Sequence, residues 1–493
     1  MERNTDVNRT SVGKNAVILT GSKILVSMLG IITAMLLARF RTLEEYGTYS
    51  QIIMVADLVS SILLLGLPNS INYFLAKEDE TENRQKFLSV YYTLSTIMTI
   101  IIAICLLLAL PIIVRYFSNS LIKKFAYVFV IYPWASLMIN SLSNACIVYG
   151  KMRKLLYFNV TQSIATLFIL LMAKILGLSF QIYMYFYMAS LFVFAVVGVL
   201  WVRSFSGRIV YSLDWELIQR IFVFSIPIGL ASVVGTITIQ LDKIVIGRFF
   251  STEQYAIFAN ASKELPVTLV ATSLTAVLLP ALVKLLDKEE KQNAVELWGY
   301  AASISFCFMA LVVGGFLIFA PDIMSLFYSE KYVTTAGVAV FRIYTLILLF
   351  KSIYWGIFLN ALGKTKFILY TSILTLIFNF IGNIVFYHLI GFIGPAISSL
   401  LVIGIMAFVQ LRFTGHLLNV PIKRILPWKN FIVNILQTLI LGVIFAVLKY
   451  RIFDCNNRNI SITISISMGV VWAVIYGLIN LKSLKESWKK LNS

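Results

Sequence analysis

Long apolar runs, separated by short polar connections, fill almost the whole chain. Each run approaches the roughly 20 residues that an α-helix needs to cross the hydrocarbon core of a bilayer. Charged clusters and Gly, Pro and Asn turns divide these runs into fourteen predicted membrane helices, near residues 15–38, 47–70, 87–114, 125–148, 155–176, 182–202, 221–247, 255–283, 293–319, 333–360, 367–388, 391–411, 431–449 and 459–480. The longest polar connections are 203–220 and 412–430. The pattern therefore predicts an all-α integral membrane protein.

The composition agrees with this class. Hydrophobic residues make up 59% of the chain and charged residues 13%, whereas soluble proteins have about 25% charged residues. The first apolar run continues from 15 to 38, which exceeds the about 7–15 residues of a signal-peptide core, and no A-x-A cleavage site follows it. We therefore expect this run to remain as the first membrane helix.

The distribution of basic residues predicts the direction of the helices. With the N-terminus placed in the cytoplasm, the inner connections carry more than twice as many Lys and Arg residues as the outer ones. The positive-inside rule then places both termini in the cytoplasm. The same asymmetry explains much of the net charge of +19. Because the chain has no arginine-rich arm and no basic stripe interleaved with aromatic residues, we do not expect nucleic acid as a partner.

Metal and nucleotide chemistry find no support in the sequence. The four cysteines and two histidines lie far apart and show no CxxC or metal-ligand spacing. The stretch LGKT at 362–365 looks like the end of a phosphate-binding loop. However, the glycine needed five residues before Gly363 is replaced by Phe358. We expect neither a metal site nor a cofactor.

Two pairs of segments indicate an internal repeat. ARFRTLEEYGTY at 38–49 aligns with GRFFSTEQYAIF at 247–258, and YGKMRK at 149–154 aligns with LGKTKF at 362–367. The similar spacing of the two pairs predicts repeats of six helices. Because six is even, both repeats run in the same direction, as in transporters whose cavity lies between two halves. The predicted domains are an N-terminal lobe (1–203), a cytoplasmic linker (204–220), a C-terminal lobe (221–412), and a C-terminal segment (413–493) with a second linker, two further helices and a basic tail.

Charged residues also occur inside the predicted helices, where bases outnumber acids. A charge at the centre of a membrane helix costs about 2.5–3.5 kcal/mol on insertion scales, so each must find a partner, water or a substrate. The bases are Lys23, Lys174, Lys243, Lys263, Arg342 and Lys351, and the acids are Asp57, Asp242 and Glu264. Lys174 and Lys243 lie near helix ends, from which they can reach the interface. Two explanations account for the charges that lie deeper in the membrane helices. They form ion pairs between helices, or they bind an anionic cargo.

Four motifs carry a resemblance to a known family: LEEYGTYS (43–50), LGLPNSINYFLAKE (65–78), DKIVIGRFFSTEQYA (242–256) and NALGKTK (360–366). They resemble the polysaccharide transporter family. These are repeat-unit flippases for O-antigen, capsule and teichuronic acid, within the multidrug/oligosaccharidyl-lipid/polysaccharide (MOP) exporter superfamily. The resemblance covers nearly the whole chain. It implies two six-helix lobes plus two C-terminal helices, a V-shaped cavity and alternating access.

The resemblance further implies a cargo and its binding residues. The implied cargo is a polyprenyl-diphosphate-linked oligosaccharide, moved from the inner to the outer leaflet of a bacterial plasma membrane. Cavity cations of the family bind the diphosphate, and the candidates here are Lys23, Lys263, Arg342, Lys351, Arg39, Arg248 and Lys243. Candidates for coupling transport to an ion gradient are Asp57, Asp242 and Glu264. Expected partners are the lipid-linked substrate and membrane lipids, with the polysaccharide polymerase and glycosyltransferases of the same pathway as further candidates.

Other functions remain as alternatives. A flippase for a peptidoglycan lipid precursor shares the fold and the diphosphate chemistry. A MATE-like drug or cation antiporter would need an acid-dominated cavity, which the excess of bases opposes. A membrane glycosyltransferase or polymerase would need a catalytic acid on a sizeable aqueous loop, and the sequence has no such loop. We therefore expect a transporter without enzymatic activity.

Overall fold

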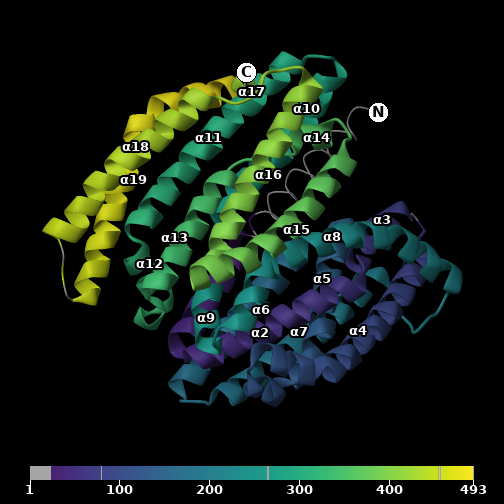
Figure 1. Cartoon of the computed structure of the whole chain (residues 1–493). Coiled ribbons are helices and arrows are strands. Elements are labelled where there is room, and N and C mark those ends of the chain that lie inside the picture. Colours follow the sequence, from purple (N-terminus) through teal and green to yellow (C-terminus); the bar gives the residue numbers. More distant parts are fainter. Residues whose placement is uncertain are drawn as a thin grey trace. The chain divides into compact units, whose positions relative to one another are not determined.

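The computed structural model describes residue 21 and residues 24–78, 80–263, 266–453, 455 and 457–491. Throughout these residues the regular structure is helical, without a strand (Figure 1). Ten helical segments in this part are long and apolar enough to cross a membrane, and one of them, Thr365–Leu418, contains two consecutive helices. The predicted all-α membrane class is thereby confirmed, whereas the count of fourteen spans is not. Lys23 and Glu264 lie outside the described residues.

The chain folds into two compact units. The first comprises residues 1–240 and 247–256, and the second comprises residues 241–246 and 257–493. The long helix α8 (Trp215–Phe249) contributes to both units. The domain boundaries proposed from the sequence stay a prediction.

Helices of the first unit pack around α5 (Tyr127–Val148), which contacts α3, α4 and α7. The unit contains, besides α5, a helix at Ile24–Phe40, α2 (Leu43–Leu64), α3 (Leu67–Lys77), α4 (Thr81–Phe117), η1 (Ser120–Phe125), α6 (Met152–Ile175) and α7 (Phe180–Ser206). The start of α2 is fixed by a capping box. Its Thr42 side chain accepts from the Glu45 backbone N–H, and the Glu45 carboxylate accepts from the Thr42 N–H.

Helices of the second unit enclose an aromatic core around α11 (Lys291–Ile318). The rings of Phe306 and Phe431 stack with centroids 4.1 Å apart, and Trp298 packs edge-on against Phe358. The other elements are α9 (Thr252–Ala261, shared with the first unit), η2 (Pro266–Thr268), α10 (Leu269–Asp287), α12 (Ala320–Tyr328), η3 (Glu330–Tyr332), α13 (Thr335–Phe350), α14 (Ile357–Ala361), α15 (Thr365–Ile390), η4 (Gly391–Ile393), α16 (Gly394–Leu418), α17 (Ile422–Ile425), α18 (Trp428–Val447), a π-helical turn η5 (Leu448–Ile452) and α19 (Arg458–Leu491).

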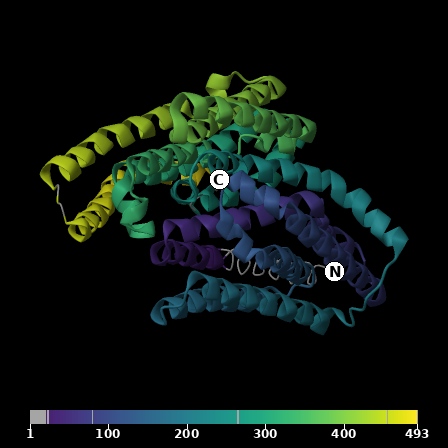
Figure 2. The same cartoon turned by 60° about the horizontal axis from the view of Figure 1, so that its bottom comes forward.

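The last two long helices form a hairpin on α11. Figures 1 and 2 both show α18 and α19 side by side, and each contacts α11. The indole Nε1 of Trp472 donates to the Leu311 carbonyl at 2.9 Å. Gly314 lets this indole approach α11, because a Cβ atom there would overlap the Trp472 ring. These contacts agree with the predicted pair of additional C-terminal helices.

Three of the predicted spans are interrupted. The run 47–70 breaks at Leu65 and Gly66, between α2 and α3; both residues have positive φ, 44° and 78°. The run 255–283 breaks between α9 and α10, and the run 333–360 breaks between α13 and α14. The second predicted span of each repeat is thus interrupted, but at different depths, and the break in 333–360 has no counterpart in the first repeat, where α5 (Tyr127–Val148) is continuous.

Candidate functional site

Asp242 lies at the centre of a buried polar cluster in the second unit. Only 4% of this residue is exposed. Its Oδ1 accepts a hydrogen bond from Asn383 Nδ2 at 2.7 Å, and its Oδ2 accepts one from Ser399 Oγ at 2.6 Å and another from the Tyr344 hydroxyl. The four side chains come from α8, α13, α15 and α16. The acid therefore ties four helices together through neutral partners.

The cluster extends to a further residue, Asn379, and contains one acceptor without a donor in the described part of the chain, the Oδ1 atom of Asn383. Asn379 Nδ2 donates to Ser399 Oγ at 3.1 Å, one helical turn from Asn383 on α15. Among the described residues, Asn383 Oδ1 is buried without a hydrogen-bond donor. Leaving such a group unpaired costs about 1–3 kcal/mol. A carboxylate, two amide oxygens and two hydroxyls are oxygen ligands of the kind that hard cations use. The cluster can therefore hold a small cation or a proton.

Two candidate lysines interact electrostatically at this cluster, Lys243 with Asp242 and Lys263 with Lys243. Lys243 is the next residue of α8 and is half-buried. Its charge acts on both the Asp242 carboxylate and the Lys263 ammonium group. Lys263 follows the end of α9, in the break before η2. The structure thus brings together three of the residues selected from the sequence.

Lys351 lies at a second helix break, directly after the last residue of α13. Its backbone N–H still donates to the Ile347 and Leu348 carbonyls. Non-helical backbone at membrane depth persists only where protein or a wet cavity covers it. Here Trp355 Nε1 donates to the Phe350 carbonyl at 2.6 Å, and the Ser305 hydroxyl donates to the Ser352 carbonyl. Broken helices of this kind carry the binding sites of many transporters.

The structure places three candidate arginines next to groups that do not belong to the Asp242 cluster. Arg342 Nε donates to the Leu317 carbonyl at 3.1 Å, in the last turn of α11. Arg248 is exposed, its Nη1 lies 3.4 Å from the Tyr116 carbonyl, and its guanidinium lies 5.7 Å from the centre of the Tyr116 ring. Arg39 is exposed at the end of the helix Ile24–Phe40. A role for these three in cargo binding stays a prediction.

The remaining candidate acid belongs to the first unit. Asp57 on α2 accepts a hydrogen bond from the Tyr132 hydroxyl on α5 at 2.9 Å. In the same unit, Thr33 takes the place of Asp242 in the internal repeat, and its hydroxyl donates to the Leu29 carbonyl of its own helix at 2.8 Å. The acid-centred cluster is therefore a feature of the C-terminal repeat.

Sequence reasoning found Asp242 but missed Asn379, Asn383 and Ser399. A signal existed, because two Asn residues four positions apart share one face of an apolar helix. Neutral polar side chains are common in membrane helices, however, so their spacing alone does not separate ligands from packing residues.

Comparisons with known proteins agree with this architecture. Residues 12–286, more than half of the chain, match the model of a family described as "Polysaccharide biosynthesis protein". No protein of curated function matches the sequence. The fold is similar to that of the lipid II flippase MurJ in an inward closed conformation, with a TM-score of 0.75, 18% identity, and coverage of 95% of this chain and 99% of that one.

Two further solved structures share the fold. An inward-facing MATE-family multidrug transporter of the MOP superfamily has a TM-score of 0.64 at 16% identity, over 80% of this chain and 94% of its own. A MOP superfamily transporter from Pyrococcus furiosus Vc1 has a TM-score of 0.57 at 15% identity, over 83% and 95%. Together with the apolar helices, these matches describe a multi-pass membrane protein that shares the fold of these solved transporters. The chain thus belongs to the polysaccharide biosynthesis protein family and has the MOP superfamily fold.

Proposed function

We propose that this protein moves a polyprenyl-diphosphate-linked oligosaccharide repeat unit from the inner to the outer leaflet of a bacterial plasma membrane. Both termini are cytoplasmic in this proposal, as the positive-inside rule favours. The cargo is a precursor of O-antigen, capsule or a similar cell-surface polysaccharide. Polymerase and glycosyltransferases of the same pathway are its proposed partners. The proposal is supported by the family match and by the excess of cations within the membrane helices.

The observation that carries the proposal is the position of Lys263 and Lys351 at helix breaks. Between Glu330 and Asp454 the sequence has no Asp or Glu, so basic residues are the only strong charges of this part of the sequence. Ammonium groups form strong hydrogen bonds with phosphate oxygens, particularly where water is scarce. Lysines at breaks in membrane helices are therefore suited to neutralising a diphosphate during its passage through the bilayer.

The mechanism requires no bond cleavage. The polar head must cross the hydrocarbon layer while the polyprenyl tail stays in lipid. The lysines at the helix breaks lower the barrier by replacing the water that solvates the diphosphate charge, and alternating access exposes the head to the other side. The chain supplies binding and shielding in these steps, in keeping with a transporter.

The Asp242 cluster supplies a candidate coupling site within this mechanism. A cation or proton bound among Asp242, Asn383 and Ser399 would strengthen the links between α8, α15 and α16. Ion binding then shifts the equilibrium between conformations only as far as its affinity for them differs. In this proposal an ion gradient drives the conformational cycle through the cluster.

A flippase for a peptidoglycan lipid precursor is the second candidate. It needs the same neutralisation of a lipid-linked diphosphate, so the lysines do not discriminate between the two cargoes. The MurJ-like fold is compatible with both. An antiporter for cationic drugs is disfavoured by the same excess of bases.

Transport in reconstituted vesicles tests the proposal. A fluorescent polyprenyl-diphosphate oligosaccharide is placed in proteoliposomes, and its appearance in the outer leaflet is followed by a quencher that does not cross the membrane. Hydrogen bonds to charged groups contribute about 1.5–3 kcal/mol. Lys263→Gln and Lys351→Gln should therefore each reduce transport by about tenfold or more, whereas Lys482→Gln on an exposed face of α19 should not.

Three outcomes would contradict the proposal. Unchanged transport in both lysine variants would remove its physical basis. Transport of a peptidoglycan lipid precursor, with rescue of cells lacking that activity, would assign the second cargo. Export of cationic dyes without movement of the lipid-linked sugar would assign the antiporter.

A further inference from the structure

A cavity of about 830 Å³ lies at one end of the α15–α16 hairpin. Its lining residues belong to the start of α15, the end of α16 and the start of α17. The segment that contains both helices, Thr365–Leu418, is long and apolar enough to cross a membrane, so we place this end of the hairpin at the boundary between membrane and water. The positive-inside rule assigns it to the cytoplasmic side.

The polar part of the cavity wall is basic. Arg412, His416 and Lys423 line it and all three are exposed, and among the described residues of the lining there is no Asp or Glu. Lys364 and Lys366 precede the lining residue Phe367 in sequence and are exposed as well. None of the ion pairs found within the described ranges involves Arg412 or Lys423. The wall therefore presents positive charge to an anion.

The rest of the cavity wall is apolar and aromatic. The rings of Phe367 and Phe413 stack with centroids 3.7 Å apart, which joins the start of α15 to the end of α16. Phe408, one turn deeper on α16, is 55% exposed. A ligand bound here would place an anionic group among the basic side chains and a hydrocarbon chain along the phenylalanines.

We propose that this cavity binds a resident anionic glycerophospholipid of the inner leaflet, such as a phosphatidylglycerol. Its phosphate would contact Arg412 and Lys423, and an acyl chain would run along Phe408 and Phe413. Basic pockets between membrane helices on the cytoplasmic side commonly bind anionic lipid headgroups. This lipid is distinct from the transported cargo, so the inference goes beyond the proposed function.

The size of the cavity favours a phospholipid over the cargo. A volume of 830 Å³ lies within the range of about 300–1,000 Å³ typical of sites for small ligands. A phosphoglycerol headgroup with the first part of its acyl chains fits this range. A diphosphate carrying an oligosaccharide and a polyprenyl chain is considerably larger.

Native mass spectrometry of the full-length protein tests the assignment. The protein in neutral detergent is titrated with palmitoyl-oleoyl-phosphatidylglycerol or with the matching phosphatidylcholine, and bound lipids are counted. The test variant combines Arg412→Gln with Lys423→Gln. The control combines Lys485→Gln with Lys489→Gln, which removes the same charge from exposed positions of α19. Each surface Lys or Arg contributes about 1 kcal/mol to binding of anionic lipid, so the tightest phosphatidylglycerol site should weaken about thirtyfold in the test variant alone.

The remaining outcomes overturn the assignment. Equal weakening of both lipids would mean that the cavity is only an apolar groove. Equal effects of the test and control variants would mean that total charge, rather than this cavity, attracts the lipid. Displacement of bound phosphatidylglycerol by an equimolar polyprenyl diphosphate, or by inorganic phosphate, would transfer the site to the cargo or to a soluble anion.

Discussion

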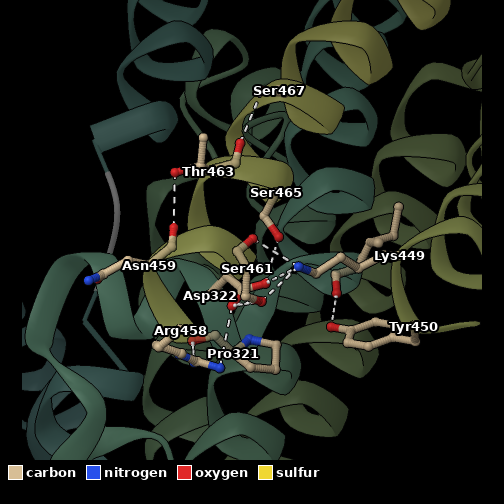
Figure 3. A network of polar contacts seen from close by, with 11 residues as sticks. Pro321, Asp322, Lys449, Tyr450, Arg458, Asn459, Ser461, Thr463, Ser465 and Ser467 are labelled. Atoms are coloured by element: carbon tan, nitrogen blue, oxygen red, sulfur yellow. Dashed lines mark hydrogen bonds and ion pairs between the residues drawn. The ribbon is translucent and has the colours of Figure 1, made fainter. Parts of the chain in front are cut away.

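Lys449 Nζ lies 3.1 Å from Asp322 Oδ2, and the two side chains are only 3% and 4% exposed. The lysine also donates to the Ser461 hydroxyl at 2.8 Å and to the Ser461 carbonyl at 2.9 Å. Asp322 accepts further hydrogen bonds from Ser461 at 3.0 Å and Ser465 at 2.5 Å, and Arg458 Nη1 approaches it at 3.4 Å (Figure 3). This network joins α12, the turn after α18, and α19.

Replacing the buried lysine should destabilise the protein strongly. Lys449→Met leaves the Asp322 carboxylate buried with reduced compensation, and breaking a buried pair in this way costs about 3–5 kcal/mol. Chaotrope unfolding in detergent, followed by tryptophan fluorescence, measures the loss. Lys485→Met, at an exposed position of α19, should change stability by less than about 0.5 kcal/mol. Equal stabilities of the two variants would exclude a contribution of the pair to stability.

The same network predicts an acid-sensitive stability. Burial acts to raise the pKa of Asp322, but hydrogen bonds from Ser465 and Lys449 and the charge of Lys449 outweigh it and hold the pKa below its ordinary value. A depressed folded-state pKa stabilises the protein above the unfolded value of about 3.9, and this contribution is lost as pH falls through the folded-state pKa. Unfolding midpoints measured from pH 7 to pH 3 should therefore decline at the acid end.

Asp322→Asn is the direct comparison for this pH dependence. The variant should be less stable than the parent at neutral pH, and the difference between them should shrink toward pH 3. Asp214→Asn serves as the control. Asp214 has its pKa lowered by a hydrogen bond and ion pair with Lys86, but water reaches this pair, whose side chains are 26% and 58% exposed. Solvent-accessible ion pairs contribute little to the free energy of unfolding. The stability of Asp214→Asn should therefore equal that of the parent across this pH range. A difference between Asp322→Asn and the parent that does not change with pH would contradict the assignment.

Two glycines in the first unit should differ in their tolerance of alanine. Gly229 of α8 meets the chain at Leu65 and Gly66, where α2 ends, and a Cβ atom at 229 would overlap the Leu65 backbone. Gly235, on the same helix, has open space around the position of a Cβ atom. Gly229→Ala should destabilise by at least about 1–3 kcal/mol through overpacking. Gly235→Ala should be neutral or stabilising by up to about 1 kcal/mol, because alanine favours helix.

The unfolding temperatures of Gly229→Ala and Gly235→Ala, measured in the same detergent, test this predicted difference in stability. A stable Gly229→Ala variant would mean that the helices separate at this crossing without loss of free energy. Gly66→Ala provides an independent check, since its φ of 78° is unfavourable for any residue with a Cβ atom.

The Asp242 cluster predicts a cation-dependent stability. The proposed coupling role makes Na⁺ or H⁺ the ligand, and a ligand that binds only the folded state raises stability with concentration. Replacing choline by Na⁺ at constant ionic strength and pH should raise the unfolding temperature of the parent but not of Asp242→Asn. Asp57→Asn should retain the shift, since Asp57 lies outside this cluster. An unchanged shift in Asp242→Asn would remove the cluster as a cation site, whereas a pH-dependent shift without Na⁺ dependence would indicate a proton.

Hydropathy predicted the all-α membrane class, but it could not predict where the helices break. The residues around Leu65, Lys263 and Ser352 remain mostly apolar on both sides of each break, so the runs continue through it. Breaks depend on whether neighbouring side chains satisfy the freed backbone groups. The hydrogen bond from Ser305 to the Ser352 carbonyl spans 47 residues, and such partners cannot be read from a local pattern.

The charged residues of the site were visible in the sequence for a physical reason. A charge in an apolar helix is costly, which makes Asp242, Lys263 and Lys351 conspicuous. Their partners were not visible, because Asn383 and Ser399 incur no comparable cost and resemble ordinary packing residues. The environment of Arg342 was equally hidden, since its acceptor is a backbone carbonyl on another helix. Charge identifies candidate positions, but only the packing of helices shows what surrounds them.

The Lys449–Asp322 pair also fixes the register of the C-terminal hairpin. One residue of helix advances the axis by about 1.5 Å and one turn by about 5.4 Å, so even a single-residue slip of α18 along α19 would strain the contacts of Lys449 with both Ser461 and Asp322. An apolar interface alone would tolerate several neighbouring alignments of similar energy. Charge burial at this point therefore selects one alignment of the two helices against α11 during assembly in the membrane.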